Sequence, residues 1–420
     1  MFGLGEASRP RGAPGPVAPT ERIVLVDILR GTALFGILLV NYNKAAAPVV
    51  SEADRAVQTA IEFFCDGSFF PLFSFLFGVG FALQVGRLES RGAGVVTTYL
   101  RRLAVLLAFG LLHSVLLASG EVLRYYAILG VPLLLIRRLP SWMLLCGVAL
   151  CLLLTVKLDW ATSLVDQVSA VVPWTAPAGP TERAEARQLE VAELRALEGS
   201  YGEQVRIRAQ MVWQGIRHFS LIAMYPIIFG MFLLGLLASR QGWLAHPLDH
   251  RAFLRRAMIA GLMVGLLGSF LSMLGPAVRS RGFDIVPQRV LDFRGALELA
   301  GNLGLSLFYG TAVTLVVSER EEWCRRLTPI GLVGRMGLTN FLTQSVVMLL
   351  VMSSFGLGLA FKVGLAALVP LKLTLFAGQI GLSRWWMRRF RFGPAEWLWR
   401  AATYGSLPTM LTHTRHERAG

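Results

Sequence analysis

The first apolar run of the sequence carries three side chains that could do chemistry inside a membrane. Within Arg22–Asn43, Asp27, Arg30 and Asn41 interrupt an otherwise hydrophobic stretch. On an α-helix these positions fall within roughly 60° of one another, so they predict one polar stripe on a lipid-compatible helix. Polar groups in hydrocarbon usually face a bundle interior or a water-filled cavity. Asp27 and Arg30 therefore either form an ion pair that fixes the helix at the membrane edge or handle substrate directly.

Further ionisable groups lie near the predicted outer ends of later runs. His113 is about 15 Å from the inner end of its run at 1.5 Å per residue, and imidazole can exchange a proton near neutral pH. Glu121 and Arg124 follow at the next turn, and Asp66 lies at the outer end of the second run. An outward-opening polar cavity would collect them. Alternatively, His113 is a hydrogen-bonded packing residue and Glu121 forms a surface ion pair with Arg124.

Asn340 and Gln344 are one helical turn apart and share a face with Gly337. They either line the same interior or hydrogen-bond between helices. The sequence contains no GxSxG, HExxH or Walker pattern, which disfavours ATP-driven transport by this chain alone. Its four cysteines form no CxxC pair, so we predict no metal site.

Composition places these residues in a membrane protein. Hydrophobic residues make up 54% of the chain, charged residues only 16%, and the mean hydropathy is +0.56. The net charge of +15 comes from arginines at the ends of apolar runs, which is typical of cytoplasmic membrane anchoring. No aromatic-interleaved basic face accompanies them, so we predict no nucleic-acid binding.

The hydropathy pattern predicts an all-α, polytopic transmembrane bundle of about ten spans with both termini cytoplasmic. Residues 103–136 could instead form one bent helix, and Gly261, Gly265 and Gly268 have the small-residue spacing of tight helix packing. The predicted spans cover 23–46, 61–85 after a polar linker at 44–58, 103–117, 122–136, 142–158, 215–238, 257–274, 296–317, 330–352 and 355–382, the last bent at Pro370.

The same pattern divides the chain into five parts. They are a disordered cytoplasmic tail (1–20), a first membrane-embedded part (21–158), an external polar insertion with one long charged helix (159–214), a second membrane-embedded part (215–391), and an interfacial helix with a cytoplasmic tail (392–420). The insertion helix is expected to be a solvated cap.

Three motifs occur in order along nearly the whole chain. They are VDILRGTALFGILLVN, GLLHSVLLASGEVLRYYAILG, and GRMGLTNFLTQS followed by FGPAEWLWRAATYG. In these motifs the chain resembles the YeiB-type family of bacterial integral membrane proteins, which carry domain of unknown function 418. The resemblance implies a multi-pass protein of the bacterial inner membrane and no particular activity.

The first run is also similar to that of the heparan-glucosaminide acetyltransferase type. The similarity rests on D-x-x-R-G followed by V-N, matched by Asp27, Arg30 and Asn41, and on Asp66–Gly78. Enzymes of that type pass an acyl group from cytosolic acyl-CoA to an acceptor across the membrane, using a His in the first external loop. This chain has no His between Lys44 and Glu62. His113 would have to take that place.

Two functions follow as hypotheses. In transmembrane acyl transfer, acyl-CoA is the donor, no cofactor is permanently bound, and the acceptor is a small molecule or glycan. His113 would act as general base or acyl relay beside Glu121. In small-molecule transport, Asp27, His113 and Glu121 would form a proton path. Besides the bilayer we expect a homo-oligomeric partner. The residues expected to bind donor or substrate are Asp27, Arg30, Asn41, Asp66, Arg124, Asn340 and Gln344.

Overall fold

The computed structural model describes residues 23–49, 51–92, 94–118, 122–168, 180–218, 224–279 and 294–411. Every named element in this part is a helix, and its only β feature is an isolated bridge between Phe390 and Leu411. The predicted all-α class is therefore confirmed. The predicted tails at 1–20 and 412–420, and Glu121, lie outside the described residues.

The helices follow one another with short connections. In chain order they are α1 (Val24–Val40), η2 (Asn43–Ala45), α2 (Glu52–Phe64), α3 (Phe69–Ser90), α4 (Val95–Leu116), α5 (Leu123–Ile136), α6 (Ser141–Val168), α7 (Pro180–Ala196), α8 (Tyr201–His218), α9 (Met224–Arg240), α10 (Arg251–Arg279), α12 (Arg294–Glu319), α13 (Glu321–Arg335), α14 (Gly337–Met352), α15 (Leu365–Arg389) and α16 (Pro394–Tyr404).

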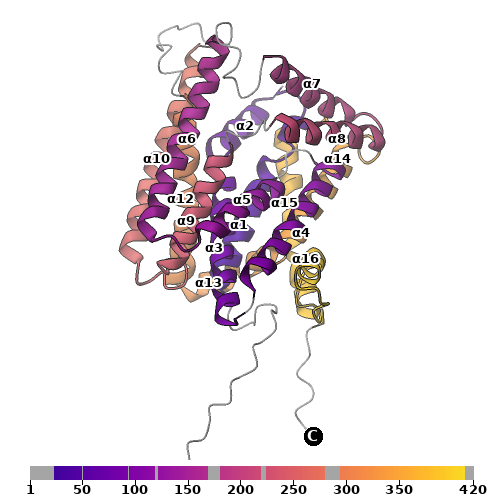
Figure 1. Ribbon diagram of the computed structural model, residues 1–420. Coiled ribbons are helices and arrows are strands. Elements are labelled where there is room, and N and C mark those ends of the chain that lie inside the picture. Colours follow the sequence, from indigo (N-terminus) through magenta and orange to yellow (C-terminus); the bar gives the residue numbers. More distant parts are fainter. Residues whose placement is uncertain are drawn as a thin grey trace, which may run out of the picture.

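The bundle has two distinct ends (Figure 1). Helices α7 and α8 cover the upper end in that view, whereas α13 and α16 lie at the lower end. We call these the cap end and the arginine end, the second after the cavity described below. Helices α6, α9, α10 and α12 stand along one side, and α4, α14 and α15 along the other, with α1 and α3 between them.

Several helices can cross a bilayer. By length and composition, six spans in the described residues qualify, and α13 with α14 would make a seventh. They are Val24–Ala45, Glu52–Ser90, Val95–Leu116, Arg251–Leu274, Arg294–Glu319 and Leu365–Arg389. Three shorter apolar helices, Leu123–Ile136, Ser141–Val156 and Tyr225–Arg240, run alongside them. The chain is thus a helical membrane protein, and a total of ten crossings stays a prediction.

Close backbone approaches hold two helix pairs together. A Cβ at Gly31 would lie 2.2 Å from the Ile330 carbonyl oxygen, so α1 and α13 meet backbone to backbone. Gly261, Gly265 and Gly268 of α10 face α12, where Gly301 and Gly304 leave matching space. The predicted small-residue packing is confirmed, although its partner stripe on α12 had not been identified.

Helical boundaries differ from the prediction in the first half of the chain. Residues predicted as a polar linker form the start of α2, because the Ser51 hydroxyl accepts a hydrogen bond from the Asp54 amide (3.0 Å) and caps the helix. Helix α4 begins at Val95, two turns before the start of the span predicted at 103–117. Helices α4 and α5 are separate, which excludes the single bent helix.

The described part of the insertion predicted at 159–214 contains two helices, α7 and α8, where one long charged helix was predicted. The chain turns after α7, and the Ser200 hydroxyl accepts a hydrogen bond from Glu203 N (3.3 Å) at the start of α8. Helix α8 then runs to His218, so residues 215–218, predicted to open a span, end this helix. Nor is α8 only a solvated cap, because Gln204 and Arg208 are buried against the bundle.

The ninth and tenth predicted spans are also interrupted. The helix predicted over 330–352 breaks at Met336, where α13 and α14 meet at 75°. Residues 355–364 form turns, with positive φ at Gly358 and Phe361, and α15 starts only at Leu365. The separate C-terminal helix predicted after residue 391 is present as α16.

Candidate functional site

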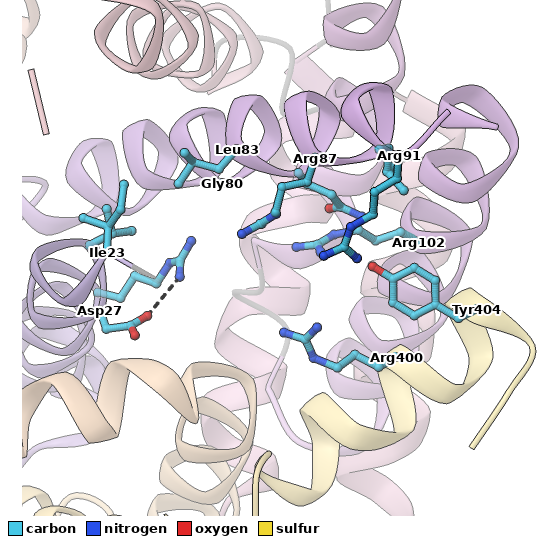
Figure 2. Close-up of a pocket in the computed structure, with 13 residues that line it drawn as sticks. Ile23, Asp27, Gly80, Leu83, Arg87, Arg91, Arg102, Arg400 and Tyr404 are labelled. Atoms are coloured by element: carbon cyan, nitrogen blue, oxygen red, sulfur yellow. Dashed lines mark hydrogen bonds and ion pairs between the residues drawn. The ribbon is translucent and has the colours of Figure 1, made fainter. Parts of the chain in front are cut away.

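A cavity of about 120 Å³ opens at the arginine end between α1, α3, α4 and α16. Five of its lining side chains are arginines, and one is an aspartate (Figure 2). The arginines come from all four helices and surround the same space: Arg30, Arg87, Arg91, Arg102 and Arg400. Guanidinium groups bind anions with several oxygens well, so the chemistry of this arginine cavity suits such a ligand.

Helix α1 supplies the innermost pair. Arg30 Nη1 lies 3.3 Å from Asp27 Oδ1, and the Asp27 side chain is almost fully buried while Arg30 is partly open to the cavity. The predicted contact between these two residues is confirmed. Gly80 of α3 leaves the space for it, since a Cβ there would lie 3.0 Å from Arg30 Nη2.

Helix α3 supplies one continuous wall. Gly80, Gln84, Arg87 and Arg91 follow at spacings of four, three and four residues, which keeps them on one helical face. Both polar atoms of the Gln84 amide are buried and have no hydrogen-bond partner among the described residues. Leaving such groups unpaired costs about 1–3 kcal/mol each, so Gln84 adds a neutral donor and acceptor that a bound molecule can satisfy.

The opposite wall belongs to α16. Arg400 and Tyr404 are one turn apart and point into the cavity from below in the close-up (Figure 2). The Arg102 guanidinium stacks 4.2 Å above the Trp399 ring, and Trp399 Nε1 donates to the Arg102 carbonyl oxygen (3.0 Å). These two contacts hold α16 against α4.

A second polar cluster lies toward the cap end. The His113 Nε2 and Ser345 Oγ atoms are 2.8 Å apart and fully enclosed, and the His113 ring packs 5.0 Å from Phe341. His113 Nδ1 is buried without a partner among the described residues. Arg208 of α8 donates to the Leu116 carbonyl oxygen (3.1 Å), which brings the cap onto the end of α4. Arg102 and His113 are about 16 Å apart along α4 at 1.5 Å per residue.

Comparisons with known proteins identify the family of this chain. A family model described as protein of unknown function (DUF418) matches residues 238–406. The Bacillus subtilis (strain 168) protein called uncharacterized protein YxaH is 32% identical over 95% of this chain and 98% of its own length. The chain belongs to the DUF418 family. Uncharacterized protein YeiB of Escherichia coli (strain K12) is 28% identical over 94% of the chain and 99% of its own length.

No solved structure matches the DUF418 chain. The names of its relatives state no activity, so its function has to be argued from the residues. The family model covers α16 with Arg400 and Tyr404, but α1, α3 and α4 lie before its first residue.

Several predicted site residues do not converge. Asn41 ends α1 far from Asp27, and its carbonyl oxygen accepts a hydrogen bond from Lys372 Nζ (2.7 Å). The predicted stripe joining Asp27 to Asn41 therefore splits between the two ends of the bundle. Asp66 is exposed in the turn after α2. Arg124 donates to the Tyr125 hydroxyl (2.5 Å) on α5, and its predicted partner Glu121 is not described.

Asn340 and Gln344 have interhelical partners. Asn340 Nδ2 donates to the Val333 carbonyl oxygen and to Ser383 Oγ, both at 3.0 Å. Gln344 Nε2 donates to Gln379 Oε1 (2.9 Å). These bonds favour the alternative in which the two side chains tie α14 to α15.

Sequence reasoning missed most of the arginine cavity. Arg87, Arg91 and Arg102 lie at the ends of apolar runs, where the sequence predicted only membrane anchoring, whereas all three line the same cavity as Arg30. The spacing from Gly80 to Arg91 was an available signal for the α3 wall. Nothing in the sequence indicated that α16 would fold back over this wall.

Lys372 was missed as well. Its ammonium group is fully buried and donates to the Leu39 and Asn41 carbonyl oxygens and to Asn43 Oδ1. It thereby satisfies oxygens at the C-terminal end of α1, where the helix dipole favours a cation.

Proposed function

We propose that this DUF418 chain is a membrane acyltransferase that takes an acyl group from cytosolic acyl-CoA to an acceptor on the other side of the membrane. The arginine cavity carries the proposal. Guanidinium groups bind phosphate oxygens in pairs, and five of them around one cavity suit a donor with several phosphates. Positive charge marks the cytoplasmic side of membrane proteins, which is the side where acyl-CoA occurs.

The residues divide into two functional groups. At the arginine end, Arg87, Arg102 and Arg400 would bind phosphate oxygens, while Asp27 orients Arg30. Toward the cap end, His113 Nε2 would accept the proton of an acceptor hydroxyl as that oxygen attacks the thioester carbonyl. The carbon–sulfur bond then breaks, and the departing thiolate takes the proton from His113. The acyl-bearing arm of the donor would span the about 16 Å that separate the two groups along α4.

Donor binding is the first test. Coenzyme A is titrated calorimetrically into the full chain in detergent micelles, with Arg87→Gln compared with Arg256→Gln. Arg256 is an exposed arginine of α10 outside the cavity. Loss of one charge-assisted phosphate contact costs about 1.5–3 kcal/mol, so Arg87→Gln should weaken binding roughly 10- to 150-fold. Equal effects of the two substitutions would contradict the proposed donor site.

Transfer is the second test. A labelled acetyl-CoA donor is supplied to membranes that contain the protein, and lipid and glycan extracts are analysed for the label. Protein with His113→Ala should bind coenzyme A unchanged and fail to pass the label to any acceptor. Transfer at the unaltered rate would show that His113 only packs against Phe341 and Ser345.

Small-molecule transport is the second candidate, and the break between α13 and α14 favours it. Discontinuous membrane helices present half-helix ends to substrates in many transporters, and these two helices meet at 75°. If transport is right, the unmodified protein should not bind coenzyme A. His113→Ala should then alter the pH dependence of uptake into membrane vesicles.

A further inference from the structure

Helix α16 closes the arginine cavity, but it is held in place from outside the cavity. Its first turn lies against the break between α13 and α14, and its last turn carries Arg400 and Tyr404 into the cavity. The contact that joins the two regions is made by Glu396. Nothing in the proposed function requires this residue to touch a substrate.

The Glu396 carboxylate caps the N-terminus of α14. Its Oε1 accepts hydrogen bonds from Leu338 N (2.6 Å) and Thr339 N (3.1 Å), and its Oε2 accepts one from the Thr339 hydroxyl (2.5 Å). The first amides of a helix have no partner within the helix, and the helix dipole favours an anion there. Glu396 thus takes the position that a bound anion occupies at other helix N-termini.

The surroundings of Glu396 fix its orientation. The residue is buried, and the Thr339 hydroxyl oxygen also accepts a hydrogen bond from Ala395 N (3.1 Å). A Cβ on Gly393 would lie 2.7 Å from Thr339 Oγ1, so a glycine is needed where the chain enters α16. Arg335 Nη2 donates to the Arg391 carbonyl oxygen (2.9 Å) just before this turn.

Glu396 lies on nearly the same side of α16 as the two residues that this helix contributes to the cavity. Arg400 and Tyr404 follow Glu396 by four and eight residues, so all three lie on nearly the same stripe of α16. A rotation or shift of the first turn would therefore move both cavity residues away from Arg30 and Arg87. The Trp399 contact with α4 fixes the middle of the helix but not its first turn.

We propose that Glu396 is a positioning residue for anion binding: by capping α14 it anchors α16 so that Arg400 and Tyr404 close the arginine cavity. This inference rests on the anion site of the proposed function. It also links that site to the helix break, because the same carboxylate holds both α14 and α16.

A double-substitution cycle tests the role. Coenzyme A is titrated into the full chain in detergent, with Glu396→Ala, Arg400→Gln and the combined variant. Loss of anchoring should weaken binding about 10- to 150-fold in Glu396→Ala, the range expected from one lost contact to a charged group. The combined variant should bind more tightly than the product of the two single effects predicts, because Glu396 acts in part through Arg400. Multiplying effects would overturn the role.

Three further variants separate positioning from general damage. Glu396→Gln keeps an oxygen that accepts amide hydrogen bonds and should bind within about twofold of the unmodified protein. Glu322→Ala removes an exposed glutamate paired with Arg326 and should bind normally. Should Glu396→Ala not fold, Thr339→Ala removes only the hydroxyl contact and should weaken binding in the same direction. Normal binding by that folded variant would overturn the proposal.

A second probe distinguishes failure of this role from failure of the proposed donor. The same variants are titrated with inorganic diphosphate. If the unmodified protein binds diphosphate but not coenzyme A, acyl-CoA is not the donor. The effect of Glu396 on anion binding can then still be measured with diphosphate. An unmodified protein that binds neither probe would overturn both proposals. Binding that weakens in Arg400→Gln but not in Glu396→Ala would refute only the positioning role.

Discussion

Single residues determine the charge balance at the arginine end. Among the described residues that line the cavity, Asp27 is the only acidic one, and it contacts Arg30. Four further arginines, from α3, α4 and α16, line the same space. This grouping of guanidinium groups around one cavity is the basis of the proposed anion site.

Glu396 gives a prediction for the pH dependence of stability. Burial raises the pKa of this carboxyl group, despite the hydrogen bonds from Leu338 and Thr339 that favour its charged form. A carboxyl group whose pKa is raised on folding stabilises the protein fully below its unfolded pKa, and this contribution is lost as pH rises through the folded pKa. The unfolding free energy of the natural protein should therefore fall relative to Glu396→Gln as pH rises above about 4.5.

Thermal unfolding of both proteins in detergent between pH 4 and pH 8 measures this difference. Glu322→Gln is the matched control, since Glu322 is exposed and its substitution should give no such trend. A difference in melting temperature that stays constant over this range, or that favours the natural protein as pH rises, would contradict the prediction.

At the scale of helices, the chain uses glycine where two backbones meet. A Cβ at Gly304 of α12 would lie 2.4 Å from Gly265 N and 2.8 Å from the Gly261 carbonyl oxygen, both of them backbone atoms of α10. Backbone cannot move aside as a flexible side chain can. Gly304→Ala should therefore push α10 and α12 apart and destabilise the protein by about 1–3 kcal/mol.

Gly381→Ala is the matched control for this packing. Gly381 also lies in a membrane-spanning helix, α15, but a Cβ there meets nothing within 4 Å. In a helix interior, Ala is favoured over Gly by roughly 0.5–1 kcal/mol, so this variant should be unchanged or slightly more stable. Chemical denaturation in mixed micelles compares the two. Equal stability of both variants would show that α10 and α12 can separate without cost.

The sequence predicted which segments form helices, but it did not predict where several of these helices begin and end. Hydropathy located the apolar core of each span, and the glycine spacing in α10 identified a packing face. The break at Met336 was missed because its cause is distant in the sequence: the amides freed there bond to Glu396. Helix α2 was missed because its start depends on a local cap at Ser51 within a polar segment.

Part of the arginine cavity could also be predicted from the sequence, and part could not. Asp27 and Arg30 were predictable together because they lie one helical turn apart. Their neighbours Arg102 and Arg400 come from helices far apart in the chain, and only the folded structure brings them to one cavity. Sequence alone also cannot distinguish an arginine that anchors a helix in the membrane from one that binds a ligand.

At the scale of the whole molecule, the arginine cavity and His113 lie toward opposite ends of the bundle. Arginine side chains surround the cavity at the arginine end, and His113 lies near the other end of α4, next to the cap. The cap is tied to the bundle by buried contacts, since Gln204 Oε1 accepts a hydrogen bond from Ser353 Oγ (3.2 Å) and Arg208 donates to the Leu116 carbonyl oxygen (3.1 Å). A transmembrane reaction requires these ends to face different compartments.

Topology therefore decides whether the proposed function is feasible. The positive-inside rule predicts the arginine end in the cytoplasm, because short loops at that end carry most arginines. If ten segments cross, Gly199 between α7 and α8 lies outside and Gly420 lies in the cytoplasm. A fused alkaline phosphatase should be active at Gly199 and inactive at Gly420, and fused green fluorescent protein should fluoresce only at Gly420. If both positions report the same side, an even number of crossings separates Gly199 from Gly420, contrary to this scheme, and His113 and the arginine cavity could not serve opposite faces.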